Sequence, residues 1–591
     1  MIKKLTINEQ KLRDLHLRKL ALGELQGPPT GYPSIDKEWL KYYNEEQIMT
    51  DMPEMKIVDY MMKNNKNNLK AIAINYFGKK ISYKKLNKFI DKCASGMISN
   101  GIKEDDIVTI CMPNTPEAVI AFYALNKIGA VANMIHPLSG QEQIKNYLNE
   151  VKSKLVITMD MSYEKVLNVV DDTNIEKIVT VTAGDSMSII KKILFKLSKN
   201  SIKLKNHSKM VRWNKFINNK TSNIINTPYR KGKTAVILHT GGTTGTPKGV
   251  ELTDDNFNVM VEQFKLDADN FKRNDKMLTI MPVFHGFGLC SSVHLPLSMG
   301  VSSILIPKLN AKKFDKTLKK YKPNHIIGVP TLFKSMLTNK KLENVDLSYL
   351  KYVVSGGDLV KDSLEEEVNK FLKNHGSDAK LNKGYGLSEA VAGVTFASKN
   401  YNNPTSIGIP MVDTNVKIVS PGTDNELREN NIGEICVYGP TVMKGYYNNI
   451  DETNNSLKNG WLHTGDLGYS KDGILYFAQR KGNMIISSGV NVYPSNIEQV
   501  IESHEAVSAC AVIGIQHPYK IQVPKAYIIL KEGYEGTIEL KQEIENLCRN
   551  KLDVYSVPYK YEFREKLPQT LLGKISHKEL VEEEKVKKYT K

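Results

Sequence analysis

The densest set of possible phosphate ligands lies in residues 238–250, which read LHTGGTTGTPKGV. The glycines let backbone N–H groups approach an anion closely, and the threonine hydroxyls add hydrogen-bond donors. Lys248 supplies a mobile positive charge suited to a polyphosphate. The segment is not a Walker A loop, because Pro247 precedes the lysine and Gly249 follows it. The alternative is a flexible surface turn, but so many donors beside a lysine favour a phosphate-binding loop.

A second group of side chains suited to a nucleotide stands in residues 384–390, which read GYGLSEA. Tyr385 can stack on a purine and Ser388 can donate to a phosphate oxygen. Glu389 is a hard oxygen ligand of the kind that Mg²⁺ takes beside ATP. Taken singly, each of these side chains also has an ordinary explanation as a loop residue.

Three further segments have the same double interpretation. Residues 355–358 read SGGD after a predicted strand, which an ordinary turn would also explain. Residues 461–468 read WLHTGDLG, in which the carboxylate of Asp466 can accept hydrogen bonds from both hydroxyls of a ribose. Residues 568–575 read PQTLLGKI, in which Lys574 is either a solubilising charge or a group that stabilises developing negative charge.

Short apolar runs alternate with helical patterns and position these segments. The runs favour strands at residues 71–76, 107–111, 130–135, 235–238, 277–282, 303–307, 325–329 and 352–355, and helices at 83–90, 116–128 and 362–375. This alternation indicates a parallel α/β sheet. Strand-like runs at 511–515 and 526–530 belong to the final segment. Capping-box spacing predicts two helix starts, at Asp362 with Glu365 and at Ser495 with Glu498.

The bulk composition limits the class of protein. A chain of 591 residues with 41% hydrophobic residues can bury a large core, so at least two domains are expected. The net charge of +18 suggests the hypothesis that the protein binds nucleic acid. The excess is mostly lysine spread along the chain, however, and arginine, the usual residue for planar recognition, is scarce. We therefore expect no nucleic-acid partner.

The cysteines and the hydropathy pattern favour the cytoplasm. The cysteines form no C-x-x-C pair and are widely spaced, at Cys93, Cys111, Cys290, Cys436, Cys510 and Cys548. That spacing argues against a disulfide scaffold and a zinc site. The N-terminus is too polar for a signal sequence, and no run of 18 apolar residues predicts a transmembrane span.

A basic insertion at residues 184–233 interrupts the α/β pattern. Residues 188–197 place apolar residues and lysines at helical spacing. A basic amphipathic helix can lie on an anionic membrane surface. One hypothesis is therefore that residues 184–205 make a peripheral membrane contact. The alternative, which we favour at this point, is a surface helix that packs its apolar side on the domain core.

The motifs together resemble those of the adenylate-forming superfamily, which contains acyl-CoA synthetases, luciferases and peptide-synthetase adenylation domains. The resemblance covers about residues 57–580, with at least five motifs in the expected order. It implies a large N-terminal α/β domain with mixed sheets and packed helices at residues 56–481, after a lead-in at 1–55. Residues 482–591 would form a small mobile α+β lid.

The resemblance also implies a role for each motif residue. The phosphate loop would bind ATP through Thr240, Thr243, Thr244, Gly245 and Lys248. The nucleotide would further contact Gly356, Gly357, Asp358, Tyr385, Gly386, Ser388, Asp466 and Arg480. Glu389 would hold Mg²⁺, Lys574 would contact the attacking carboxylate and the α-phosphate, and Gly489 would meet the pantetheine of CoA. Ser388 replaces the usual threonine of its motif and retains the hydroxyl.

The acyl-pocket motif of the family is matched by residues 282–289, which read PVFHGFGL. It would place His285 and Phe287 near the carboxylate entry, although a histidine beside aromatic residues is also a common core residue. The motif holds no aspartate to pair with an amino-acid ammonium, so a simple carboxylic acid is expected. A medium- or long-chain fatty acid is our first hypothesis.

The implied function is an ATP-dependent acid–CoA ligase that forms acyl-AMP and transfers the acyl group to CoA. Two departures from the family pattern affect the lid: Gln479 stands where glycine or aspartate is usual, and Gly482 aligns with the hinge position, normally aspartate or lysine. One alternative is a ligase that loads a carrier protein. Another is a non-catalytic nucleotide-binding or membrane-associated scaffold, although the intact motif residues argue against it.

Overall fold

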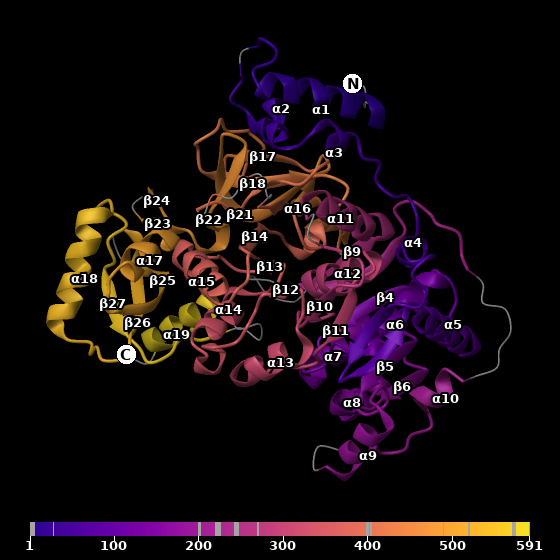
Figure 1. Ribbon diagram of the computed structural model, residues 1–591. Coiled ribbons are helices and arrows are strands. Elements are labelled where there is room, and N and C mark those ends of the chain that lie inside the picture. Colours follow the sequence, from indigo (N-terminus) through magenta and orange to yellow (C-terminus); the bar gives the residue numbers. More distant parts are fainter. Residues whose placement is uncertain are drawn as a thin grey trace. The chain divides into compact units, whose positions relative to one another are not determined.

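The computed structural model describes residues 6–27, 29–198, 202–218, 226–240, 248–268, 271–397, 401, 403, 405–487, 490–517, 520–569 and 575–589. The chain forms two compact units. The first comprises residues 1–27, 37–415 and 437–462, and the second comprises 28–36, 416–436 and 463–591. The expected α/β class with mixed sheets is confirmed (Figure 1). The expected boundary of a moving lid at residue 482 stays a prediction.

One sheet of the first unit has eight strands within the described residues, in the order β19-β9-β8-β4-β3-β5-β6-β7. Strands β8 to β7 in this order run parallel, and β9 and β19 are antiparallel additions. The bounds are β3 (Ile107–Cys111), β4 (Val131–Ile135), β5 (Leu155–Met159), β6 (Lys177–Val181), β7 (Met210–Arg212), β8 (Thr234–Thr240), β9 (Lys248–Thr253) and β19 (Gly445–Tyr446). The central strands β3, β4 and β5 are buried and mostly apolar, as expected where helices cover both faces, with one polar residue in each.

A second sheet of the first unit has nine strands within the described residues, in the order β16-β15-β14-β13-β12-β10-β11-β1-β2. The bounds are β1 (Ile72–Tyr76), β2 (Lys79–Ser82), β10 (Lys276–Thr279), β11 (Ser302–Leu305), β12 (His325–Gly328), β13 (Tyr352–Ser355), β14 (Leu381–Tyr385), β15 (Thr395–Phe396) and β16 (Ile409–Pro410). Strands β1 and β10 to β14 run parallel, so their carboxyl ends meet at one edge. Ligands of open α/β sheets bind at that edge.

Two smaller sheets have five strands each within the described residues. One comprises β17 (Asn415–Val419), β18 (Gly433–Tyr438), β20 (Leu457–Lys458), β21 (Trp461–Lys471) and β22 (Ile474–Arg480). The other comprises β23 (Ile485–Ser487), β24 (Val490–Val492), β25 (Val507–His517), β26 (Ile521–Leu530) and β27 (Lys560–Phe563). The latter sheet packs on α17 and α18 through a core that includes Ile497, Val512, Ile528 and Ile544.

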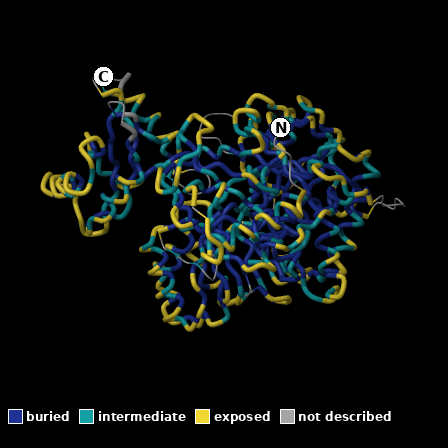
Figure 2. The backbone as a smooth tube through the Cα atoms, turned by 90° about the horizontal axis from the view of Figure 1, so that it is seen from above, coloured by how far each residue is buried: buried dark blue, intermediate teal, exposed yellow. Residues whose placement is uncertain are grey.

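Buried segments of the chain lie inside and exposed segments lie at the surface (Figure 2). Helix α6 is buried along nearly its whole length; it begins at Pro116, with the Thr115 hydroxyl accepting from the Ala118 N–H. The larger helices are α1 (Ile7–Ala21), α4 (Ile57–Asn64), α5 (Tyr83–Ser99), α6 (Pro116–Lys127), α7 (Gln141–Glu150), α8 (Asp160–Leu167), α9 (Ile189–Leu197), α11 (Asp254–Asp267), α13 (Phe314–Tyr321), α14 (Pro330–Leu337), α15 (Asp362–Asn374), α17 (Pro494–Glu502), α18 (Ile538–Lys551) and α19 (His577–Tyr589). The shorter helices are α2 (Pro33–Asp36), α3 (Glu45–Met49), α10 (Trp213–Phe216), α12 (Leu295–Ser298) and α16 (Ile450–Ser456).

Both predicted capping boxes are wrong. Helix α15 begins at Asp362, and Lys361 occupies the N-cap position. Helix α17 begins at Pro494. The side chains expected to cap α17 are used elsewhere: Ser495 donates to the Ala478 carbonyl, and Glu498 accepts from the Val512 N–H at 2.7 Å. The proline at the first helical position was the better signal of where α17 starts.

Candidate active site

The hairpin of β8 and β9 carries the predicted phosphate loop. Thr240 ends β8 and is paired with Lys248, which begins β9. The two residues therefore stand opposite each other at the mouth of the hairpin. The predicted phosphate ligands Thr243, Thr244 and Gly245 lie outside the described residues.

A buried polar chain crosses the sheet beneath this hairpin. His239 Nε2 lies 2.7 Å from Asn133 Oδ1, and the Asn133 amide donates to the Thr109 hydroxyl at 2.9 Å. Because the amide oxygen accepts, His239 carries its proton on Nε2. Burial lowers the pKa of His239 to about 4, so the imidazole is neutral near pH 7. Sequence reasoning assigned no role to His239 or Asn133, although a polar residue within an apolar strand is a usable signal.

Lys248 contacts two side chains that sequence reasoning did not single out. Its ammonium pairs with the Glu452 carboxylate and lies 5.0 Å from the centroid of the Tyr446 ring. The Tyr446 hydroxyl donates to Glu389 Oε1 at 2.9 Å. The predicted phosphate-binding lysine and the predicted magnesium ligand are thus joined through one tyrosine. Burial first, and then the Glu389 carboxylate, raise the pKa of Tyr446 far above its usual range, so the hydroxyl remains a donor.

The backbone fixes Tyr446 in this place. Strand β19 pairs with β9, and Tyr446 stands opposite Val250. The Thr453 hydroxyl of α16 accepts from the Tyr446 N–H at 2.9 Å. The Met443 N–H donates to the Glu389 carbonyl at 2.8 Å, which ties the two segments together. Residues some 200 positions from the hairpin therefore complete its charged surroundings.

Two other predicted nucleotide-binding motifs meet at the carboxyl ends of β13 and β14. Gly356, Gly357 and Asp358 follow β13, and Tyr385 ends the parallel neighbour β14. The Phe287 ring packs on the first two of these: a Cβ on Gly356 would lie 3.3 Å from Phe287 Cζ. The acyl-pocket motif and the Gly-Gly-Asp turn are therefore brought together. Asp358 is exposed, and its carboxylate accepts from the Leu359 N–H.

Backbone segments approach one another closely around this edge. A Cβ on Gly286 would lie 1.7 Å from the Val391 carbonyl oxygen, and a Cβ on Gly386 would lie 1.6 Å from the Ala392 carbonyl oxygen. Val391 has a φ of 62°, which is strained for a β-branched residue. Ser388 and Glu389 begin the short 3₁₀ turn just before it. Only glycine fits at positions 286 and 386, so these glycines seat the acyl-pocket motif against the Glu389 turn.

His285 lies in the acyl-pocket motif, just before a helix that begins at Phe287. Its ring centroid is 5.0 Å from that of Phe284, which in turn lies 4.3 Å from the His136 ring. The following residues Phe287–His294 form a π-helix, a rare element that is frequent at functional sites. The contact of His285 with an acid substrate stays a prediction.

In the second unit, Asp466 and Arg480 face each other across β21 and β22. Arg480 Nε lies 2.8 Å from Asp466 Oδ1, and Asp466 is fully buried. The guanidinium compensates the buried carboxylate and orients it. The structure thus brings the two predicted ribose-binding residues together. Gly482 follows in a short 3₁₀ turn, and a Cβ there would meet nothing within 4 Å. Lys574 and Gly489 lie outside the described residues.

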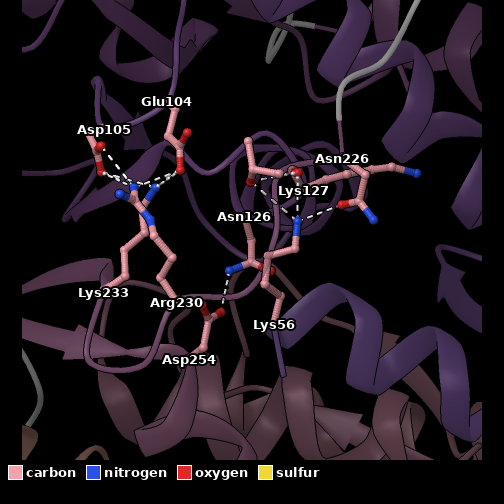
Figure 3. A network of polar contacts seen from close by, with 10 residues as sticks. Lys56, Glu104, Asp105, Asn126, Lys127, Asn226, Arg230, Lys233 and Asp254 are labelled. Carbon is pink, nitrogen blue, oxygen red and sulfur yellow. Dashed lines mark hydrogen bonds and ion pairs between the residues drawn. The ribbon is translucent and has the colours of Figure 1, made fainter. Parts of the chain in front are cut away.

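A polar network anchors the far end of β9 (Figure 3). Asp254, the first residue of α11, accepts from the Ile57 N–H at 2.9 Å and from the Asn126 amide at 2.6 Å. Burial raises the pKa of Asp254 to about 6. The nearby Lys56 ammonium donates to the Lys127 carbonyl and the Asn226 amide oxygen. The adjoining cavity of about 10 Å³ has room for about one water molecule, so this network is structural.

The residues present fit a magnesium ion that is held largely by phosphates. Among the described residues, no three histidine, cysteine, aspartate or glutamate side chains cluster as a metal site. Mg²⁺ bound with ATP commonly takes only one or two protein carboxylates and otherwise phosphate and water oxygens. Glu389, partly exposed and held at Oε1 by Tyr446, meets that requirement.

Comparisons with known proteins agree on the family. The family described as AMP-binding enzyme matches residues 62–447, and the AMP-binding enzyme C-terminal domain matches residues 496–574. A long-chain-fatty-acid–CoA ligase of Bacillus subtilis (strain 168) is 32% identical over 521 residues, covering 87% of this chain and 91% of the relative.

Solved structures share the fold. The anthranilate CoA ligase AuaEII in complex with anthranoyl-AMP has a TM-score of 0.78 and 21% identity, covering 90% of this chain and 98% of its own. The ATP-bound MatB of Rhodopseudomonas palustris has a TM-score of 0.76 and 22% identity, and the match covers 90% of this chain and 99% of MatB. Because the two family models match residues 62–447 and 496–574, this chain belongs to the AMP-binding enzyme family.

Proposed function

We propose that this protein is an ATP-dependent, AMP-forming acid–CoA ligase that activates a long-chain fatty acid. The observation that carries the proposal is the junction of Lys248, Tyr446 and Glu389 at the mouth of the β8–β9 hairpin. It places a cation for phosphates over the face of one tyrosine ring and a carboxylate for Mg²⁺ at the hydroxyl of the same tyrosine. The substrate class is supported by the Bacillus subtilis relative, named a long-chain-fatty-acid–CoA ligase.

The first half-reaction activates the acid. A carboxylate oxygen attacks the α-phosphorus of ATP, the bond to the leaving pyrophosphate breaks, and acyl-AMP forms. Thr240 and Lys248 hold the phosphates, while Asp466 accepts from the ribose hydroxyls and is oriented by Arg480. Mg²⁺, when bound at Glu389, offsets phosphate charge. Lys574 contacts both the attacking carboxylate and the α-phosphate, and stabilises the charge that develops between them.

The second half-reaction transfers the acyl group. The thiol of CoA attacks the acyl carbon, AMP leaves with the bonding electrons of the carbon–oxygen bond, and the thiol proton is released. Gly489 lines the path of the pantetheine, and the lid rotates about residues 480–483, which include Gly482, to withdraw Lys574. A glycine permits the large backbone change that a hinge needs. A cytoplasmic location stays a prediction.

A Lys574→Ala variant separates the two half-reactions. We expect pyrophosphate release from ATP with palmitate to fall at least about 100-fold, because a charge contact made in the transition state is lost. Conversion of supplied palmitoyl-AMP and CoA into palmitoyl-CoA should persist, which also shows that the variant folds. Full pyrophosphate release by the variant would remove Lys574 from the mechanism. Wild-type turnover that is indifferent to CoA would favour loading of a carrier protein.

A further inference from the structure

Helix α9 is oriented opposite to the usual pattern of a surface helix. Its five aliphatic side chains point outward, with exposed fractions of 80% for Ile189, 73% for Ile190, 54% for Ile193, 62% for Leu194 and 80% for Leu197. The expectation that this helix packs its apolar side on the domain core is therefore wrong. At about 100° per residue, the five side chains form one continuous stripe of about 140°.

The opposite face of α9 is tethered to the first unit by polar and aromatic groups. The Lys191 ammonium donates to the Phe77 carbonyl, and Lys192 Nζ lies 3.2 Å from Asp185 Oδ1. Phe195 lies against Gly184, where a Cβ would come within 3.4 Å of its ring. These contacts hold the opposite face against the unit and leave the apolar stripe exposed; α9 is labelled at the lower end of the ribbon in Figure 1. The orientation is thus fixed by the fold.

The chain around the stripe is strongly basic. Residues 186–233 contain thirteen lysines and arginines and not one aspartate or glutamate. Some of these charges are matched by acids elsewhere in the unit, as Lys205 is by Glu164 and Lys209 by Asp171. Lys203 is exposed and directly follows Ile202, an additional aliphatic side chain that is 49% exposed. The stripe therefore lies within a lysine-rich stretch of the chain.

This combination selects among the possible partners. A second copy of this chain would bring two lysine-rich segments together, and like charges at close range oppose that contact. An anionic surface gains from both features, because aliphatic side chains enter the acyl boundary while lysines meet the headgroups. Among the described residues, no helix is long and apolar enough to cross a bilayer, so α9 would lie in the plane of the interface.

We propose that α9 is a membrane-docking helix that lays its Ile189–Leu197 stripe on an anionic lipid bilayer. The stripe belongs to an insertion between β6 and β8 and contains none of the residues assigned to nucleotide binding. The proposal is independent of the ligase reaction, since it requires neither ATP nor an acid. Its consequence for a fatty-acid ligase is that the enzyme would meet its substrate at the surface where such acids partition.

Vesicle flotation of the full-length protein, without substrates, tests the proposal. The vesicles contain either phosphatidylcholine alone or phosphatidylcholine with one-third phosphatidylglycerol. Wild-type protein should float with the anionic vesicles and much less with the neutral ones, and high salt should reduce the difference. The Ile193→Glu/Leu194→Glu variant should bind the anionic vesicles at least about tenfold more weakly, because two inserted side chains become charged.

A matched control separates the stripe from general surface chemistry. The Ile538→Glu/Val554→Glu variant changes the same net charge at two aliphatic residues that are 78% and 76% exposed. It should float like the wild type. An Ile193→Trp variant supplies a direct readout, since its fluorescence should shift to shorter wavelength only with anionic vesicles.

Three results would overturn the proposal. The first is equal flotation of the wild type and the Ile193→Glu/Leu194→Glu variant. The second is no flotation of the wild type at all. The third is a wild-type dimer in light scattering that the stripe variant dissociates, which would identify a second copy as the occupant. Because the replaced side chains are exposed, all variants should keep the wild-type thermal midpoint.

Discussion

Replacing Tyr446 by phenylalanine removes one hydroxyl and keeps the ring beneath Lys248. The lost interaction is the 2.9 Å hydrogen bond to Glu389 Oε1, made by a tyrosine that is 8% exposed. A hydrogen bond to a charged acceptor contributes about 1.5–3 kcal/mol. Without this bond the Glu389 carboxylate is no longer held in one orientation. If the loss is about 2 kcal/mol, the apparent affinity for Mg·ATP should fall by about 30-fold.

The assay is the initial rate of pyrophosphate release over a range of Mg²⁺ concentrations at fixed ATP. We expect a higher Mg²⁺ requirement for Tyr446→Phe and an unchanged requirement for the control Tyr447→Phe, which alters the adjacent side chain. Direct ATP titration with and without Mg²⁺ should show the defect only when the metal is present. The reasoning would be refuted by a lower Mg²⁺ requirement, because Tyr446 would then be competing with the metal for Glu389.

Three other variants test neighbouring parts of the account. Glu452→Gln frees Lys248 from an ion pair in which the lysine side chain is 25% exposed and the glutamate side chain 39%. ATP should then bind about twofold tighter, corresponding to about 0.5 kcal/mol. Calorimetric titration with ATP measures this affinity, and weaker binding would contradict the reasoning. His239 is neutral in the fold with a pKa of about 4, whereas the unfolded chain protonates near pH 6.5, so stability falls as the pH falls through this window. The free energy of unfolding should therefore fall between pH 7 and pH 5 in the wild type, and in His239→Gln it should fall by about 2 kcal/mol less. Urea titration at both pH values measures this difference. Equal decreases in the two proteins would show that His239 is not buried in its neutral form. Gly286→Ala places a methyl group 1.7 Å from the Val391 carbonyl and should lower the free energy of unfolding by about 1–3 kcal/mol, whereas Gly482→Ala, which meets nothing within 4 Å, should not; equal urea midpoints would disprove the close approach.

Much of the fold could be predicted because local sequence determines it. The mostly apolar runs at residues 107–111 and 352–355 are buried strands, as expected, because a strand covered on both faces is mostly apolar. The capping boxes failed for a local reason as well. Acidic residues are favoured in the first turn of any helix, so the same spacing arises without a capping box. Glu365 is such a first-turn residue in α15.

The parts that could not be predicted depend on contacts distant in the chain. Tyr446 and Glu452 reach Lys248 only because β19 pairs with β9, and no spacing in the sequence indicates that pairing. Likewise, helical periodicity showed that α9 has an apolar stripe but not which side faces the protein. That orientation is set by the contacts of Lys191, Lys192 and Phe195 with residues outside the helix.

The most direct test of the central claim is the product balance of one reaction. Purified protein is incubated with palmitate, ATP, Mg²⁺ and CoA, and palmitoyl-CoA, AMP and ADP are quantified by mass spectrometry. The account predicts palmitoyl-CoA and AMP in equal amounts, with palmitoyl-AMP accumulating when CoA is omitted. Formation of ADP in place of AMP, or no acyl product from any fatty acid between C8 and C18, would contradict it.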